Sequence, residues 1–258
     1  MYIETEKSTP LVSVIMPAYN AETFIRDAID SVRTQTIIDW ELLVIDDCSK
    51  DETCSIVEEI AYIDSRVKLL RNEKNMGAAG SRNRGLDIFR GKYVALLDSD
   101  DYWYPNMLEK MLYRAAETEA DIIYCSYELV DEQGVKVCND FLVPEKTSFQ
   151  ESIVRSVITC STVLFTRELA KNNRFPINMY HEDIAMWFQI LRDGGTARGV
   201  PDVLAAYRQR SDSKTANKLK SACRRWIIYR KHLKMPLFWS TVTMVQYGIN
   251  GLKKFKRI

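Results

Sequence analysis

The stretch Gly91–Tyr104, GKYVALLDSDDYWY, constrains the fold more than any other part of the chain. Tyr93–Leu97 is an apolar, partly β-branched run that stops at three carboxylates, Asp98, Asp100 and Asp101. A short run of this kind, followed by turn residues, predicts a strand that is buried on both faces, as in a parallel sheet. Ligands of open parallel sheets bind beyond the carboxyl ends of the strands. The three acids are therefore predicted to face a ligand crevice.

Three neighbouring carboxylates repel one another, and a hard divalent cation is the simplest compensation. Mg²⁺ and Mn²⁺ prefer oxygen ligands and usually hold substrate phosphates as well, so this stretch predicts a metal–phosphate site with Mn²⁺ or Mg²⁺ as the cofactor. A single Asp at a strand end is more often a turn former or a helix cap. Three acids within four residues are less easily explained in that way.

The rest of the first half alternates strand and helix patterns. Strands are predicted at Leu11–Met16, Trp40–Ile45, Val67–Leu70 and Ile122–Tyr124, and helices at Ala21–Thr34, Glu52–Tyr62, Gly77–Phe89 and Asn106–Glu117. The second half is less regular, with strands expected at Ile158–Thr166 and Val203–Tyr207 and a helix at Asp183–Arg192. This order predicts an α/β fold with a doubly wound, mostly parallel sheet flanked by helices.

Two further strand ends carry polar residues that would face the same crevice. Tyr19, after the first strand, can lay its ring against a base, and Asp47, after the second, can accept hydrogen bonds from a uracil-type N–H or a ribose hydroxyl. Capping of the helix near Glu52 is the alternative for Asp46 and Asp47. Polar clusters at three strand ends favour a nucleotide site.

A glycine-bearing segment, Gly77–Arg84, opens the third helix. It lacks both the G-x-G-x-x-G and the G-K-[ST] spacing, so it is neither a dinucleotide fingerprint nor a P-loop. Its small residues still allow a phosphate to approach the start of the helix. The guanidinium of Arg82 can donate two hydrogen bonds to a phosphate or to one of the acids. Arg84 is explained equally well as a residue on the solvent-exposed face of this helix, with no ligand.

A second acidic pair, Glu182 and Asp183, follows His181 and opens the helix that carries Trp187. An Asp in a first helical turn is stabilised by the helix dipole and often does nothing else. If Asp183 faces the metal site, however, it is the best-placed carboxylate for a general base. With only two histidines in the chain, a hydrolytic triad is not expected.

Charge is distributed unevenly along the 258 residues. Residues 1–212 hold 24 bases and 35 acids, a net charge of −11, whereas residues 213–258 hold twelve bases and no acid. The start of the chain is not a secretory signal, no stretch is apolar enough to span a membrane, and six scattered cysteines fit reduced thiols. We therefore predict a cytoplasmic protein with a catalytic domain at 1–212 and a helical tail at 213–258.

The ordered segments VSVIMPAYN, VIDDCSKD, NMGAAGSRNRGL, LLDSDDYWYP and HEDIAMW resemble the successive motifs of the family 2 inverting glycosyltransferases, which have the GT-A fold. The resemblance runs from about residue 11 to residue 212. Ser81 stands where that family often has Ala. The resemblance implies a GT-A catalytic domain that uses a nucleotide sugar.

The resemblance also implies a role for individual residues. Donor nucleotide binding maps to Pro17, Tyr19, Asn20, Asp46, Asp47, Arg82, Asp98 and Asp100, and metal binding to Asp100 and Asp101. Asp183 is the expected base, and Arg208 and Arg210 belong to a loop that contacts the diphosphate. Trp103 and Glu182 are expected near the acceptor or the donor sugar.

The processive members of that family carry a Q-x-x-R-W motif, which this chain lacks. The resemblance to enzymes of bacterial surface-polysaccharide assembly, such as O-antigen, capsule or teichuronic acid, implies a non-processive enzyme. It would add one sugar, from a UDP-sugar, to a saccharide linked to polyprenyl diphosphate. A sugar-nucleotide nucleotidyltransferase and a non-catalytic nucleotide-sugar-binding module are the alternatives.

The tail mixes its bases with aromatic and aliphatic residues. Basic helices with Trp and Phe lie in the interface of anionic bilayers, which predicts peripheral attachment to the inner face of the cytoplasmic membrane. Alternatively, the tail packs on the catalytic domain or on a second copy in a homodimer. Nucleic-acid binding is not expected, because no motif supports it.

Overall fold

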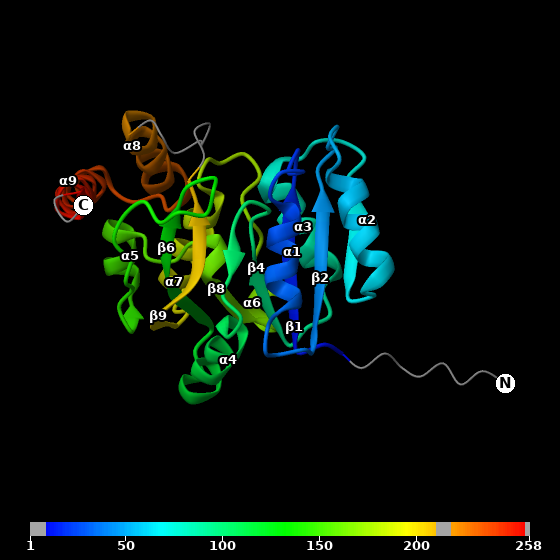
Figure 1. Cartoon of the computed structure of the whole chain (residues 1–258). Helices are drawn as coiled ribbons and strands as arrows, with labels where there is room; N and C mark the ends of the chain where they lie inside the picture. Colours follow the sequence, from blue (N-terminus) through cyan, green and yellow to red (C-terminus); the bar gives the residue numbers. More distant parts are fainter. Residues whose placement is uncertain (1–8, 210–217, 256–258) are drawn as a thin grey trace.

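The computed structural model describes residues 9–209 and 218–255. Its centre is a twisted sheet in the order β3-β2-β1-β4-β8-β6-β9-β5, with β7 paired to β9 (Figure 1). Strands β1, β2, β3, β4, β6 and β9 all run in one direction, as the parallel pairs and the two antiparallel contacts of β8 require. Their carboxyl ends therefore lie at one edge, the upper edge in Figure 1.

The elements have the following bounds. The strands are β1 (Val12–Ala18), β2 (Trp40–Asp46), β3 (Val67–Arg71), β4 (Tyr93–Leu96), β5 (Tyr102–Trp103), β6 (Ile122–Val130), β7 (Lys146–Thr147), β8 (Val163–Thr166) and β9 (Ala197–Arg208). The helices are α1 (Ile25–Arg33), α2 (Thr53–Ile63), α3 (Gly77–Ile88), α4 (Met107–Thr118), α5 (Phe149–Arg155), α6 (Arg167–Asn172), α7 (Glu182–Arg192), α8 (Lys218–Ile227) and α9 (Leu237–Phe255), with a 3-10 turn η1 (Cys160–Thr162) and a π-helical turn η2 (Ile228–His232).

Helices cover both faces of the sheet, which confirms the doubly wound α/β architecture. Side chains alternate along a strand, so β1 sends Val14 to one face and Ile15 to the other. The Val14 face packs under α1, α2 and α4, and the Ile15 face under α3, α6 and α7. Trp187 and Ile190 of α7 are buried there, as their helical spacing predicts. Strands β1, β2 and β4 of the first half are thus interior strands, whereas β3 forms one edge of the sheet.

The second half departs from the prediction at Ile158–Thr166. Only Val163–Thr166 is a strand, β8, and Cys160–Thr162 forms the single turn η1. Strand β8 is antiparallel to both of its neighbours, β4 and β6. Its first residues therefore lie at the upper edge, which brings η1 beside the end of β4. A short apolar run has the same residue pattern whether its strand pairs in parallel or antiparallel, so the sequence could not show the direction of β8.

The tail packs on the catalytic domain through part of its length. Ile228, Tyr229 and Leu233 are buried against Phe188 of α7 and Ile153 of α5. This is the packing that the sequence left as an alternative to membrane attachment. The domain boundary predicted at 212/213 lies outside the described residues. Among the helices of residues 9–209 and 218–255, none has both the length and the apolar character to cross a bilayer.

Helix α9 exposes apolar side chains and buries polar ones. Leu237, Phe238 and Trp239 are 61%, 69% and 57% exposed, whereas Ser240 and Thr243 are buried. The rings of Phe238 and Trp239 meet edge to face, with their centroids 5.3 Å apart. We call Leu237–Trp239 the apolar triad. The tail thus both contributes to the core and presents an apolar surface.

Candidate active site

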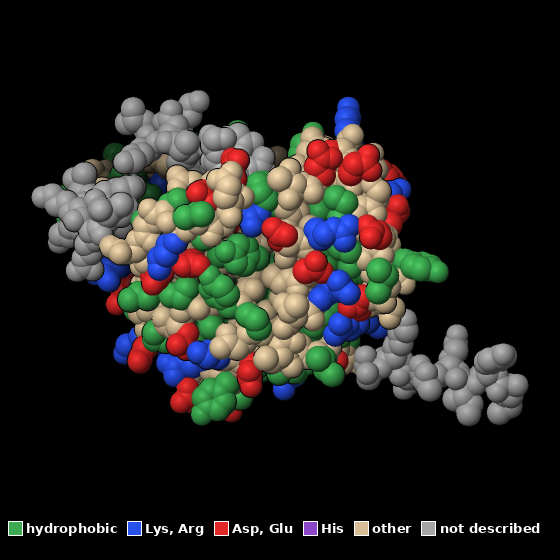
Figure 2. Space-filling view, in the orientation of Figure 1, with side chains coloured by type: hydrophobic (Ala, Val, Ile, Leu, Met, Phe, Trp, Pro, Cys, Tyr) green, Lys and Arg blue, Asp and Glu red, His purple; other side chains and the backbone are tan. Residues whose placement is uncertain are grey.

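Three polar turns meet at the carboxyl edge of the sheet, as the sequence predicts. The turns after β1 and β2 are tied together: the Asn20 amide donates to the Ser49 hydroxyl at 2.9 Å, and the Asn20 side chain accepts from the Lys50 amide at 2.9 Å. On the face drawn in Figure 2, acidic side chains gather over the upper ends of β1 and β2. Pro17 is buried within β1, while Tyr19 is 52% exposed beside these turns. The Tyr19 ring is accessible to a planar ligand.

Asp47 anchors the start of α3. Its Oδ1 accepts from the Asn72 side chain at 2.7 Å and from the Met76 amide at 2.8 Å, and its Oδ2 accepts from the Gly77 amide at 2.7 Å. Asp46, also buried, accepts from the amide of Ser49. These bonds fix the glycine-bearing segment at the crevice, and Oδ2 of Asp47 retains capacity for a further donor. Nucleotide binding by Asp46 and Asp47 stays a prediction.

The acids after β4 divide into two kinds. Asp98 and Asp100 are partly exposed, while Asp101 is 2% exposed and accepts from the Arg208 amide at 2.8 Å and from the Ser161 hydroxyl. Burial, reinforced by the charges of Asp100 and Asp98, raises the pKa of Asp101 well above its usual value. Asp101 thus connects the turn after β4 to the end of β9.

The donor set fits a metal ion that arrives with a diphosphate. Within residues 9–209 and 218–255, no group of three acid, His or Cys side chains is arranged to hold a cation by itself. Mg²⁺ and Mn²⁺ are commonly bound by one or two carboxylates together with substrate phosphates and water. Asp98 and Asp100 provide such carboxylates at the crevice, and the raised pKa of Asp101 marks a place where positive charge is favourable. Metal binding by Asp100 and Asp101 stays a prediction.

Arg82 connects the two halves of the site. Its side chain is 5% exposed, and it donates from Nη2 to Asp98 at 2.6 Å and from Nη1 to Glu182 at 2.8 Å. The guanidinium also lies 5.5 Å from the centre of the Phe175 ring. The contact with Asp98 confirms the prediction that Arg82 bonds one of the acids, whereas the contact with Glu182 is one that the sequence motif does not reveal.

Asp183 lies in the first turn of α7, next to Glu182 and close to Arg82. The residue before them, His181, has a left-handed backbone with φ of 58°, which turns the chain sharply into the helix. Burial and the neighbouring charge of Glu182 raise the pKa of Asp183 to about 6, against the opposing charge of Arg82. A carboxylate with this pKa is ionised at neutral pH and basic enough to accept a proton.

Two other predicted residues, Trp103 and Arg208, are buried. Trp103 is 2% exposed and donates from its indole N–H to the Ser161 carbonyl at 2.7 Å, so it backs the site from the core. Arg208, at the end of β9, is 6% exposed, with its guanidinium 4.3 Å from the Phe24 ring and 5.5 Å from the Tyr102 ring. Arg210 lies outside the described residues.

Ser161 and Cys160 of η1 are site neighbours that the sequence reasoning missed. Ser161 bonds Asp101 and also accepts from the Asp98 amide at 3.1 Å. Cys160 is buried beside Arg82; burial raises its pKa well above the usual value for a thiol. Neither belongs to a recognisable motif. Only the reversed direction of β8, which places η1 at this edge, could have indicated them.

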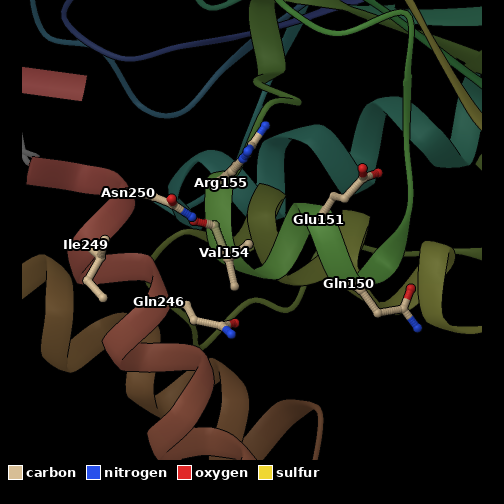
Figure 3. Close-up of a pocket in the computed structure, with 7 residues that line it drawn as sticks. All are labelled: Gln150, Glu151, Val154, Arg155, Gln246, Ile249 and Asn250. Carbon is tan, nitrogen blue, oxygen red and sulfur yellow. The ribbon is translucent and has the colours of Figure 1, made fainter. Parts of the chain in front are cut away.

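A separate pocket of about 370 Å³ lies between α5 and α9 (Figure 3). It is lined by Gln150, Glu151, Val154 and Arg155 of α5 and by Gln246, Ile249 and Asn250 of α9. None of the acidic residues at the carboxyl edge lines it. The pocket is therefore distinct from the candidate active site.

The chain is similar to proteins of one family. The model of "Glycosyl transferase family 2" matches residues 13–172. TuaG of Bacillus subtilis, whose assignment to teichuronic acid biosynthesis is provisional, is 36% identical over 95% of this chain and 97% of its own length. The UDP-Glc:alpha-D-GlcNAc-diphosphoundecaprenol beta-1,3-glucosyltransferase WfgD of Escherichia coli is 36% identical over 95% of this chain and 94% of its own.

Two solved structures share the fold. TarS 1-349 of S. aureus in complex with UDP-GlcNAc superposes with a TM-score of 0.72 at 21% identity, over 92% of this chain and 71% of the other. The mannosyltransferase PcManGT of Pyrobaculum calidifontis, in complex with GDP-Man and Mn²⁺, gives 0.71 at 19% identity, over 93% and 70%. At these identities the likeness concerns the fold alone.

Proposed function

The chain belongs to glycosyl transferase family 2, and from this premise we propose that it moves one sugar, with inversion, from a UDP-sugar to a saccharide carried on polyprenyl diphosphate. The single observation that carries the proposal is the bridge of Arg82 between Asp98 and Glu182, which joins a nucleotide-side acid to the acidic pair that contains Asp183. The alternatives, nucleotidyl transfer and sugar binding without chemistry, give no role to a carboxylate with a pKa of about 6 beside that bridge.

The donor would bind over the carboxyl ends of β1, β2 and β4. The exposed Tyr19 ring offers a face to the base, and the fixed backbone around Asp47 and Gly77 offers a rigid wall for the nucleoside. UDP as the nucleotide is supported by the similarity to WfgD, which is named for its UDP-Glc donor. The donor sugar would then extend from the diphosphate toward α7.

Asp100 and Asp101 would hold a divalent metal together with the diphosphate, a proposal that the Mn²⁺ bound to PcManGT supports. When bound, such an ion neutralises the charge that develops on the leaving diphosphate. Arg208 would add positive charge at the same side, since its amide already contacts Asp101.

Asp183 would accept the proton of the acceptor hydroxyl. Attack from the face opposite the diphosphate inverts the anomeric carbon, and it requires the base and the leaving group to lie on opposite sides of the sugar. Glu182, fixed by Arg82, holds the first turn of α7 in place during this step. Its proposed role near the sugar is thus one of positioning.

We further propose that the protein works at the cytoplasmic face of the cell membrane, where a lipid-linked acceptor is available. The apolar triad, with Arg230, Lys231 and Lys234 in the preceding turns, would enter the headgroup region of anionic lipids. A second copy of the chain, covering the triad in a homodimer, is the competing occupant.

The test is a transfer assay with UDP-sugars, Mn²⁺ and a sugar on a lipid diphosphate. Wild type is expected to release UDP and extend the acceptor, and chelation of Mn²⁺ to abolish both. Asp183→Asn should lower kcat at least a thousandfold and leave the Kd of UDP-sugar within about twofold, because the amide cannot accept the proton. Near wild-type transfer by this variant would exclude Asp183 as the base. Binding of the UDP-sugar by wild type without any turnover would favour a non-catalytic module.

A further inference from the structure

Helix α8 of the tail lies beside the entry to α7. The guanidinium carbon of Arg224 is 3.9 Å from the centre of the Tyr180 ring, and Tyr180 is 60% exposed. The charges of Arg225 and Arg224 add to the effect of burial in lowering the pKa of His181, so both arginines are close to it. His181 precedes Asp183 by two residues. The tail therefore brings two cations to the approach of the proposed base.

The two arginines have different surroundings. Arg225 is 3% exposed, with its guanidinium 5.2 Å from the Phe188 ring and 4.5 Å from the Tyr247 ring. Among the described residues its Nη1 has no hydrogen-bond partner, so the two rings must offset part of the cost of burial. Arg225 thereby fastens α8 to α7 and α9. Arg224 is partly exposed and lies against an exposed ring.

We propose that Arg224, oriented by the Tyr180 ring, forms the subsite for the diphosphate of the lipid-linked acceptor. This inference rests on the proposed function. If Asp183 contacts an acceptor hydroxyl, and if the acceptor sugar is attached directly to the diphosphate, then the two phosphates lie one sugar ring away from Asp183. The guanidinium of an arginine suits a phosphate at that distance, since it can donate two parallel hydrogen bonds.

The position of Arg224 fits the acceptor better than the donor. The residues proposed for the metal and the donor diphosphate, Asp100 and Asp101, follow β4, whereas Arg224 reaches the site from the tail, next to the segment that begins α7. In Figure 1, α8 stands at the same edge as the carboxyl ends of the strands, on the side away from β2. The apolar triad begins only ten residues after α8 ends at Ile227, so a lipid chain and its diphosphate would meet the same tail.

The experiment compares two acceptors that differ only in the diphosphate: a sugar on an alkyl diphosphate and the same sugar as an alkyl glycoside. Arg224→Ala should lower kcat/KM for the diphosphate acceptor by about tenfold to a hundredfold, the usual range for losing a charge-assisted contact. The value for the glycoside and the KM for UDP-sugar should stay within about twofold. Arg224→Lys should recover part of the lost kcat/KM, because lysine keeps the positive charge but cannot donate two parallel hydrogen bonds.

Lys171→Ala removes an exposed cation of α6, outside the proposed sites and the membrane surface, and serves as the matched control, with no change expected for either acceptor. Equal losses on both acceptors would overturn the subsite and show that Arg224 only docks α8; so would a rise in the donor KM alone. Calorimetric binding of the alkyl-diphosphate sugar separates the two proposals. If wild type transfers nothing, the proposed function fails, and an equal Kd for wild type and Arg224→Ala overturns the subsite as well.

Discussion

At the residue scale, the contacts of Arg82 join positions 100 residues apart in the chain. One guanidinium serves a carboxylate at the end of β4 and another at the start of α7, and it is almost completely buried. Removing one partner from a buried ion pair is costly because the other charge is left without compensation. Arg82 therefore sets the charge that Asp183 experiences, in addition to any contact it makes with the donor.

The dependence of kcat on pH follows from Asp183. With a pKa of about 6, the base form predominates at pH 7 and falls to about a tenth at pH 5, so kcat should decline as the pH drops through 6. Arg82→Gln removes a cation that favours the ionised carboxylate and leaves the charge of Glu182 uncompensated. Both changes raise the pKa of Asp183, and the acid limb should move to higher pH by about one unit.

Arg84→Gln is the control on the same helix. Arg84 donates to the Arg71 carbonyl and to the Asn72 side chain, and within the described part of the chain it is not bonded to any of the site acids. The acid limb of the kcat–pH profile of Arg84→Gln should coincide with that of wild type in steady-state assays at saturating substrate concentrations. An Arg82→Gln profile with an unmoved midpoint, whatever its height, would contradict the coupling between Arg82 and Asp183.

At the element scale, the π-helical turn η2 makes the tail part of the folded domain. Tyr229 is completely buried, and its hydroxyl donates to the Ile153 carbonyl of α5. Phe188 of α7 belongs to the same apolar cluster. Because α7 also begins with Glu182 and Asp183, the tail supports the helix on which the proposed base stands.

Tyr229→Ala should lower the free energy of unfolding by about 3–5 kcal/mol, the cost of removing a large buried side chain. Urea unfolding followed by circular dichroism measures this value. Tyr113→Ala, at a tyrosine of α4 that is 72% exposed, should stay within about 0.5 kcal/mol of wild type. A similarly small effect for Tyr229→Ala would mean that the tail does not pack on α5 and α7 in solution.

The sequence predicts some of these elements well, for identifiable reasons. The runs ending at Asp46 and Leu96 are mostly apolar and are followed by acids, so both the strands and the polar turns after them can be recognised. The bridge from Arg82 to Glu182 could not be predicted, because it depends on how α3 and α7 come together on one face of the sheet. Trp103 was expected near a sugar, yet an aromatic residue gives no sign of its depth, and this one is buried.

At the scale of the whole molecule, the surface has two distinct regions. Acids gather at the carboxyl edge of the sheet (Figure 2), where a cation with a diphosphate would be attracted. The apolar triad lies on α9, at the far side of the molecule from α2 (Figure 1). An exposed apolar group flanked by bases is typical of proteins that contact anionic bilayers.

Flotation with phosphatidylglycerol vesicles tests this surface. The double variant Phe238→Ser/Trp239→Ser should lose most of its flotation, because the two rings supply much of the apolar area that can enter the headgroup region. Raising the salt concentration should weaken the flotation of wild type, since the neighbouring bases are screened. Both measurements use the full chain.

Tyr62→Ser/Ile63→Ser is the matched control, since these two residues at the end of α2 are 94% and 70% exposed. This variant should float as wild type does. Equal flotation of both double variants would exclude the apolar triad as the membrane contact. A shift from dimer to monomer on Phe238→Ser/Trp239→Ser, without any effect on flotation, would instead identify a second copy as the occupant.

The reversed direction of β8 has a consequence for how such enzymes diversify. With η1 brought to the carboxyl edge, the residues proposed for the nucleotide and the metal precede Pro105 in the chain, while the proposed base, the proposed acceptor contacts and Arg208 follow Thr159. A single genetic crossover between α4 and α5 could therefore combine one ancestor's choice of nucleotide sugar with another's choice of acceptor. Such a hybrid would have to keep one contact between its two parts: the Arg208 amide of β9, from the second ancestor, must still donate to Asp101, from the first.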